Sequence, residues 1–246
     1  MKRSIKAVVM AAAMVVMLAG LASAQDFKKA YTIPAGGQIS VKNVSGDVKV
    51  TGYNGSSILV DAYKVGKDRD LVQIEDLSTG DKVQVRVHYP EHCNCDASVN
   101  FEVHVPSNVD YTFDSIGSVS GDVELSGVQG NIKTESVSGD VVLTDVSGTI
   151  KASSVSGSVN AQLARTTKPG DLKFSSVSGS VTVKAPTLQD ADIEMSSVSG
   201  AVLTDFAIDV QKEQYGPGQH ARGRLGSGAT TLRISTVSGK VSLTSK

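Results

Sequence analysis

The densest group of residues that could do chemistry is the segment HYPEHCNC, residues 88–95. His88, His92, Cys93 and Cys95 are side chains of the kind that bind zinc. No second pair of closely spaced cysteines or histidines completes a zinc motif. These are the two cysteines of the chain, and exported thiols usually oxidise. We therefore predict a disulfide between Cys93 and Cys95 and no metal site, with bound metal or free thiols as the alternatives.

The cysteines would lie at the tip of a β-hairpin. Residues 82–89 and 98–105 both alternate apolar and polar side chains, which is typical of half-buried strands. If Arg86 faces Glu102 across an antiparallel pair, the same register places Cys93 opposite Cys95.

Serine is the second candidate for chemistry, because it recurs in the tripeptide Val-Ser-Gly. The glycine of this tripeptide stands at residues 46, 121, 139, 148, 157, 179, 200 and 239. A serine nucleophile needs an activating base, and the motif G-x-S-x-G is absent. A serine at a tight corner can instead bond the neighbouring backbone. We predict no catalytic residue, no cofactor and no enzymatic activity.

Aspartate follows the glycine at Asp47, Asp122 and Asp140, which raises the question of calcium. The equivalent positions elsewhere are Ser158, Ser180, Ala201 and Lys240, so the acidic pattern is not kept. We interpret these aspartates as turn residues.

The repeats that carry these residues predict the fold. From Ser118 to Gln162 the chain reads SVSGDVELS, GVQGNIKTE, SVSGDVVLT, DVSGTIKAS and SVSGSVNAQ. Valine at position 2, glycine at 4, Val or Ile at 6 and mostly Leu, Ala or Thr at 8 would share one inward face. Units of two kinds alternate, so one coil holds two strands and 18 residues, lengthening to 22 and 21 later. This pattern predicts an all-β, single-stranded β-solenoid, right-handed by the usual crossover preference.

Three segments follow from this reading. Residues 1–24 have a basic start, an apolar run and the small residues Ala22-Ser23-Ala24, which indicate a cleaved signal peptide. Residues 25–117 are expected to be a β-rich N-terminal capping half. Residues 118–246 are expected to be the solenoid, with a long loop at 206–228 that contains Lys212, His220, Arg222 and Arg224 and could bind a ligand.

Composition limits the partners. Removing the leader takes away three basic residues and leaves 21 Lys and Arg against 25 Asp and Glu, which argues against nucleic acid. The apolar run of the leader is too short to span a bilayer comfortably, and no second apolar stretch follows it. The chain has no Trp, which weakens a sugar-binding site built on aromatic rings.

The segment GGQISVKNVSGDVKVTGYNG, residues 36–55, resembles the start of a bacterial putative-adhesin, β-strand-repeat domain family of unknown function. The segment GSGATTLRISTVSGKVSL, residues 226–243, is similar to that family's end. The resemblance implies an exported or envelope-attached protein with the character of a right-handed β-helix and without catalytic residues. We therefore expect a periplasmic or surface-exposed, adhesin-like module whose partner is an envelope protein or glycan. The alternative is a carbohydrate-binding or carbohydrate-acting β-helix protein.

Overall fold

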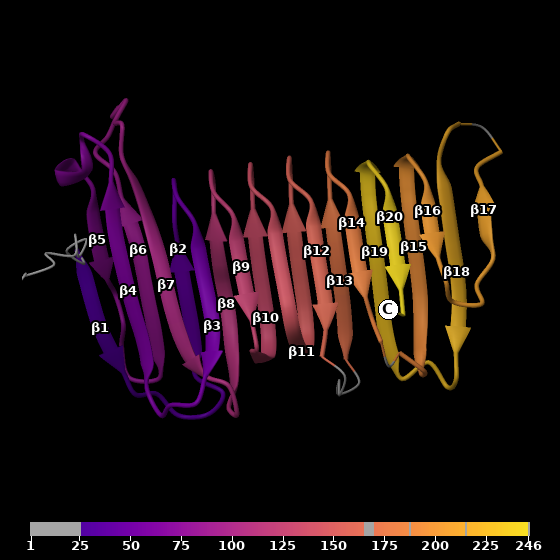
Figure 1. The fold of residues 1–246 in the computed structure, drawn as a ribbon, viewed down its shortest axis with the longest axis horizontal. Coiled ribbons are helices and arrows are strands. Elements are labelled where there is room, and N and C mark those ends of the chain that lie inside the picture. Colours follow the sequence, from indigo (N-terminus) through magenta and orange to yellow (C-terminus); the bar gives the residue numbers. More distant parts are fainter. Residues whose placement is uncertain (1–25, 165–169, 187, 215, 246) are drawn as a thin grey trace, which may run out of the picture.

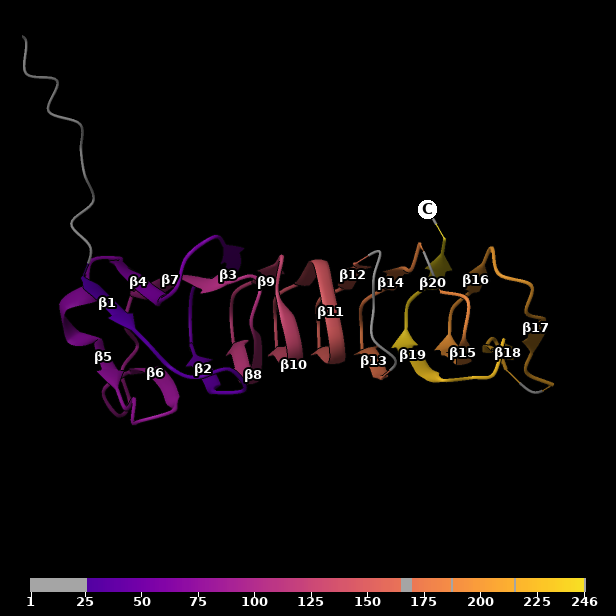
Figure 2. The same ribbon diagram turned by 90° about the horizontal axis from the view of Figure 1, so that it is seen from below.

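The computed structural model describes residues 26–164, 170–186, 188–214 and 216–245. The predicted leader lies outside these residues. They form 20 strands and one short 3-10 helix, Arg69–Leu71. Two long sheets face each other along the molecule, as the two layers of Figure 2 show. The all-β class predicted from the repeats is confirmed.

Sheet B is one of these layers. Its eight central strands are parallel, and antiparallel strands flank them at both ends. Its order is β5 (Gln73–Asp76), β6 (Lys82–His88), β2 (Gln38–Lys42), β8 (Asp110–Ser118), β10 (Gln129–Ser136), the second part of β11 (Val141–Ser154), β13 (Asp171–Ser176), β19 (Thr230–Ser238), β15 (Ala191–Ser199), β18 (Gln219–Leu225) and β17 (Val210–Lys212).

Sheet A is the other layer, and it is parallel apart from its first two pairings. Its order is β1 (Phe27–Tyr31), β4 (Ile58–Val65), β7 (Ser98–Pro106), β3 (Val48–Tyr53), β9 (Val123–Ser126), the first part of β11, β12 (Val159–Leu163), β14 (Val181–Lys184), β20 (Val241–Thr244) and β16 (Val202–Thr204).

Each coil consists of one strand from sheet B, a corner, and one strand from sheet A (Figure 1). The corner carries Val-Ser-Gly in every described coil except β6–β7. Val123 pairs with Val141, and Ile132 pairs with Ile150. Both pairs are 18 residues apart, so the predicted period is confirmed. The apolar residues at positions 6 and 8 are buried between the sheets, as expected, and form one continuous core.

The prediction that the valine at position 2 of the repeat always points inward is wrong. It is buried in Val128 and Val146, but it is exposed wherever it precedes the Ser-Gly of a corner that leads from sheet B to sheet A. At these corners, which we call the VSG corners, the residue before the valine turns inward, and the valine and the residue after it lie on the solvent side. The inward residue is serine at most corners, Thr236 before Val237 and Asn43 before Val44. The alternation therefore changes phase. The exposed valines, in stack order, are Val44, Val119, Val137, Val155, Val177, Val237 and Val198.

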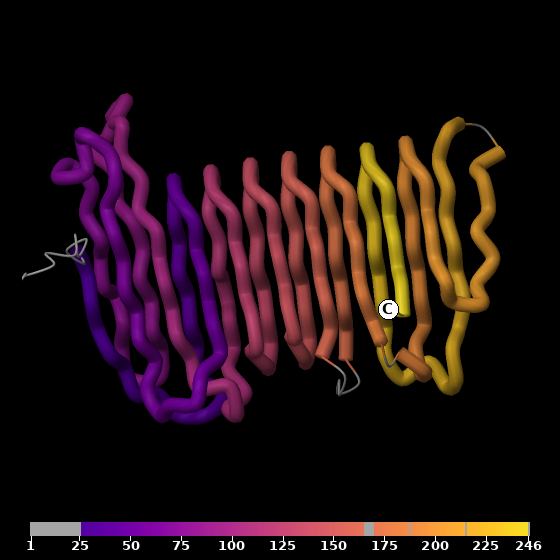
Figure 3. The backbone as a smooth tube through the Cα atoms, in the orientation of Figure 1, coloured from indigo at the N-terminus to yellow at the C-terminus, as the bar shows by residue number. Residues whose placement is uncertain are grey.

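Coils do not stack in chain order at either end. The coil β2–β3 lies between β6–β7 and β8–β9, and β19–β20 lies between β13–β14 and β15–β16. Figure 3 shows the yellow C-terminal strands within the stack, flanked by orange ones. The expected division at residue 117 falls inside β8, and 38–53 already form a regular coil.

The antiparallel hairpin expected for residues 82–105 is wrong. β6 belongs to sheet B and β7 to sheet A, so the two strands are halves of one coil. Arg86 forms an ion pair with Glu75, and Glu102 lies opposite Lys49 and Asp61 instead. Both strands alternate as expected, but each fills the core from its own sheet.

Residues 206–228, expected as a long loop, contain two strands. β17 and β18 pair antiparallel, and β18 pairs antiparallel with β15. This hairpin covers the C-terminal edge of sheet B, which would otherwise expose unpaired backbone groups.

Candidate functional site

The VSG corners use their serine hydroxyls for structure. Ser154 Oγ accepts the N–H of Gly157 at 2.9 Å and donates to the carbonyl oxygen of Gly139, on the neighbouring coil, at 2.8 Å. The same two bonds occur at Ser136 and Ser176. The bond to the neighbouring glycine carbonyl is also made by Ser118, Ser197 and Thr236. These hydroxyls therefore form hydrogen bonds that join neighbouring coils, which is a structural role and not that of a nucleophile.

The aspartates after the corner glycines are used in the same way. Asp47 Oδ1 accepts the N–H of Asp122 at 2.9 Å, and Asp122 Oδ1 accepts the N–H of Asp140 at 2.8 Å. Asp140 continues the series to the N–H of Ser158 at 2.7 Å. Each carboxylate thus bonds the next coil's backbone. Among the described residues, no group of three or more His, Cys, Asp or Glu side chains is arranged to hold a metal ion.

The histidine- and cysteine-containing segment lies at the tip between β6 and β7. Cys93 and Cys95 are placed as a bonded pair with their Cα atoms 5.1 Å apart, within the range of disulfides. His92 has a left-handed backbone (φ 58°) that turns the chain there. His88 ends β6 and lies opposite Gln73 of β5. The oxidised state of the two cysteines stays a prediction.

Charged residues of the C-terminal hairpin, a second candidate site in the sequence, hold that hairpin in place. Arg222 pairs with Glu194, and Arg224 makes a bidentate pair with Asp192. Hydrogen bonds from these arginines lower the pKa of Glu194 and Asp192. His220 Nδ1 lies 2.9 Å from Glu213 Oε1. These contacts fasten β18 to β15.

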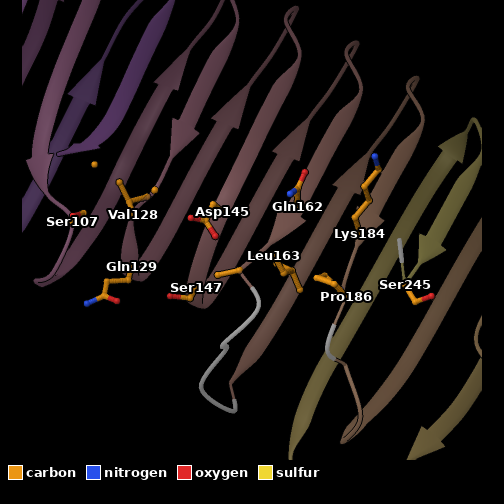
Figure 4. Close-up of a pocket in the computed structure, with 13 residues that line it drawn as sticks. Ser107, Val128, Gln129, Asp145, Ser147, Gln162, Leu163, Lys184, Pro186 and Ser245 are labelled. Atoms are coloured by element: carbon orange, nitrogen blue, oxygen red, sulfur yellow. The ribbon is translucent and has the colours of Figure 1, made fainter. Parts of the chain in front are cut away.

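A hollow of about 830 Å³ lies at the corners opposite the VSG corners, where strands of sheet A end. Figure 4 shows Asp145, Gln162 and Lys184 at successive positions along it. Asp145 is the one carboxylate among its lining residues. Glycoside hydrolysis ordinarily needs two carboxyl groups flanking one bond, so this lining does not supply that chemistry.

A second depression, the corner groove, follows the VSG corners on the side of sheet B and has a volume of about 460 Å³. The exposed valines Val119, Val137, Val155 and Val177 line it, together with Glu135 and the serines at 153 and 175. The sequence analysis missed this groove because it placed these valines in the core. The signal that could have revealed it is the serine three residues before Gly121, Gly139, Gly157 and Gly179, because the opposite corner has Asp145 at that position before Gly148.

These features define an all-β repeat protein in which stacked two-strand coils form two facing, mostly parallel sheets. The chain belongs to the Toastrack DUF4097 family, whose model matches residues 11–244. This confirms the resemblance to a putative-adhesin family of unknown function.

Solved structures that are similar to the chain include the following two. One is a putative cell adhesion protein from Clostridium sporogenes, with a TM-score of 0.53 at 9% identity, covering 89% of this chain and 99% of that one. The other is a putative adhesin from Bacteroides fragilis, with a TM-score of 0.34 at 12% identity, covering 88% and 96%. No curated protein matches the chain. The described residues include no helix long and apolar enough to cross a membrane.

Proposed function

We propose that the chain is an exported, non-catalytic, adhesin-like module that presents a rigid face to a component of the cell envelope or surface. The main observation behind the proposal is that the repeated hydroxyls and carboxylates form hydrogen bonds between neighbouring coils. Ser154 and Asp140, the residue types that could suggest catalysis or calcium, join one coil to the next. The outer faces of the sheets are then the surfaces left for a partner.

The family and the fold support this proposal. The Clostridium sporogenes protein that shares the fold is described as a putative cell adhesion protein. A signal peptide ending at Ala24 is consistent with such a location, and mature protein beginning at Gln25 is the expected product. A carbohydrate-acting enzyme is the weaker alternative, because the lining of the large hollow supplies a single carboxylate.

Binding of the purified mature chain to isolated cell envelopes tests the proposal. The expected result is saturable binding that unlabelled protein displaces. Two surface variants, one on each sheet, locate the binding face. Envelopes that retain no more of this chain than of an unrelated exported protein would contradict the proposal, as would a full-length chain that stays in the cytoplasm with its leader attached.

A further inference from the structure

The outer face of sheet B carries a row of basic residues on four adjacent parallel strands. Lys133 of β10 pairs in register with Lys151 of β11, Lys151 with Lys173 of β13, and Lys173 with Arg233 of β19. Their chain neighbours Ile132, Ile150, Leu172 and Leu232 are buried, so the basic side chains point outward. Adjacent strands lie about 4.8 Å apart. We call these four residues the basic row.

Three of the four residues in this row form no ion pair among the described residues. Like charges directly opposite one another destabilise a sheet, and the described ion pairs include none to Lys133, Lys151 or Lys173. Only Arg233 has an acidic partner, Glu194, at 3.6 Å. The carboxylates on the same face nearby, which make no described ion pair with the row, are Asp114, Glu135 and Asp171.

The next strands of the same sheet are arranged differently. There, Glu194 pairs with Arg222 and Asp192 with Arg224, so acidic residues of β15 face basic residues of β18. Sheet B therefore places opposite charges on adjacent strands where the charged side chains serve only to hold those strands together. The basic row is a departure from that arrangement in a chain whose formal net charge is −1.

Hydroxyl groups flank the basic row on both sides. Ser153, Ser175 and Ser235 lie in register two residues beyond the row, and the hydroxyls of Thr149 and Thr231 lie two residues before it. The corner groove, with its exposed valines, runs beside the serines. The face thus combines cations at the spacing of strands, hydrogen-bonding hydroxyls and a shallow apolar border.

We propose that this face binds a linear acidic glycan, with its anionic groups on the basic row and its hydroxyls on the flanking Ser and Thr. This inference rests on the proposed function and names the partner class. A polymer of charged sugars fits because it offers repeated anions, many hydroxyls and apolar C–H surfaces. Single-stranded nucleic acid fits less well, since no aromatic side chain lies in the row or its flanking rows to stack a base.

Titration of the mature protein with polygalacturonate, and with uncharged dextran as the reference polymer, tests the inference. The variant Lys133→Gln/Lys151→Gln/Lys173→Gln is expected to weaken polygalacturonate binding about tenfold or more and to reduce the salt dependence of its affinity. The matched control Lys28→Gln/Lys49→Gln/Lys184→Gln, on strands of sheet A, removes the same charge and should stay within about twofold of wild type.

The unfolding temperature of the Lys133→Gln/Lys151→Gln/Lys173→Gln variant, measured without glycan, shows whether weaker binding is due to loss of folding. It should equal or exceed that of wild type, because opposed like charges have been removed. Equal binding to dextran, an equal loss in the sheet A variant, or a lower unfolding temperature would overturn the inference. So would tighter row-dependent binding to duplex DNA or to anionic phospholipid vesicles. Envelope binding without polygalacturonate binding would refute this inference alone, whereas polygalacturonate binding without envelope binding would refute the proposed function.

Discussion

The Ser154 hydroxyl donates to the carbonyl oxygen of Gly139 on the adjacent coil, 2.8 Å away, and both residues are buried. The same hydroxyl accepts the N–H of Gly157 within its own coil. One side chain therefore closes a corner and joins it to its neighbour. Repetition of this contact along the stack explains why a serine or threonine stands three positions before every VSG-corner glycine except Gly46, where Asn43 donates to backbone carbonyls instead.

Ser154→Ala should destabilise the protein by about 1–3 kcal/mol, because it leaves a buried N–H and a buried carbonyl without their partner. Ser154→Thr is the matched control, since Thr236 makes the equivalent bond to Gly179 at 2.8 Å. Urea unfolding of the three proteins measures both effects. Equal stability of the alanine variant and wild type would show that the hydroxyl bridge is dispensable.

Gly139→Ala should cost about 2–4 kcal/mol, because coils touch at the corner backbone. A Cβ at Gly139 would lie 2.0 Å from the carbonyl oxygen of Gly121. Ser138→Ala, an exposed change in the same corner, should have little effect. Thermal unfolding separates the two, and an unchanged midpoint for Gly139→Ala would refute the close stacking described.

Thr134→Val should stabilise the protein by about 1 kcal/mol, because its hydroxyl is buried without a hydrogen-bond partner. Thr134 lies between Ile116 and Ala152 on the adjacent strands. The same substitution at Thr236, whose hydroxyl is bonded, should destabilise it. A fall in the unfolding midpoint of Thr134→Val would reveal a partner for that hydroxyl.

Acid should weaken the N-terminal end of the stack through Asp76. Burial opposes ionisation of this carboxyl, but hydrogen bonds from Lys29 and Ser78 outweigh it and lower its pKa to about 2. Because the folded pKa is depressed, the stabilisation is present above about pH 4 and is lost as the pH falls toward 2.

Asp76→Asn should therefore cost on the order of 1–2 kcal/mol at neutral pH and progressively less in acid. Unfolding in urea at several pH values measures the difference from wild type. Asp70→Asn, whose side chain is 94% exposed, is the control. A difference that stays constant down to about pH 2 would rule out this linkage.

Cys93 and Cys95 should contain no free thiol when the unreduced protein is unfolded and treated with a thiol reagent. The ring they close is so short that reduction should change the free energy of unfolding by less than about 2 kcal/mol. Two titratable thiols would contradict the bridge. Stoichiometric zinc that is lost on His92→Ala would support the metal alternative instead.

The repeat predicted the period, the two strands in each coil and most of the core, because Ile132 and Ile150 stand in a strict nine-residue pattern. It could not predict that Val137 is exposed while Val146 is buried. Both precede Ser-Gly, but they lie at opposite corners of the coils. Only at the corner of Val137 does the residue before the valine, Ser136, turn its hydroxyl inward. The pairing partner of Arg86 was missed for a different reason. The alternation of apolar and polar residues predicts which face of a strand is buried, but it does not predict which sheet the strand joins.

The basic row was only partly visible in the sequence. Lys133 and Lys151 hold the same position in two repeat units, but Arg233 is separated from Lys173 by an entire coil and hairpin. Arg233 joins the row because β19 enters the stack beside β13. Long-range order of this kind is decided by packing between coils.

The position of β19–β20 inside the stack also bears on how the molecule forms and comes apart. A solenoid that stacks in chain order can add coils one at a time and lose them from its ends. Here β15–β16 are made before the strands that separate them from β13–β14, so that end of the array is completed only when residues 230–245 arrive. Once it is complete, the last two strands have a neighbour on each side. The coil β19–β20 is thus protected from fraying, and we expect the hairpin β17–β18, at the edge of sheet B, to open before it.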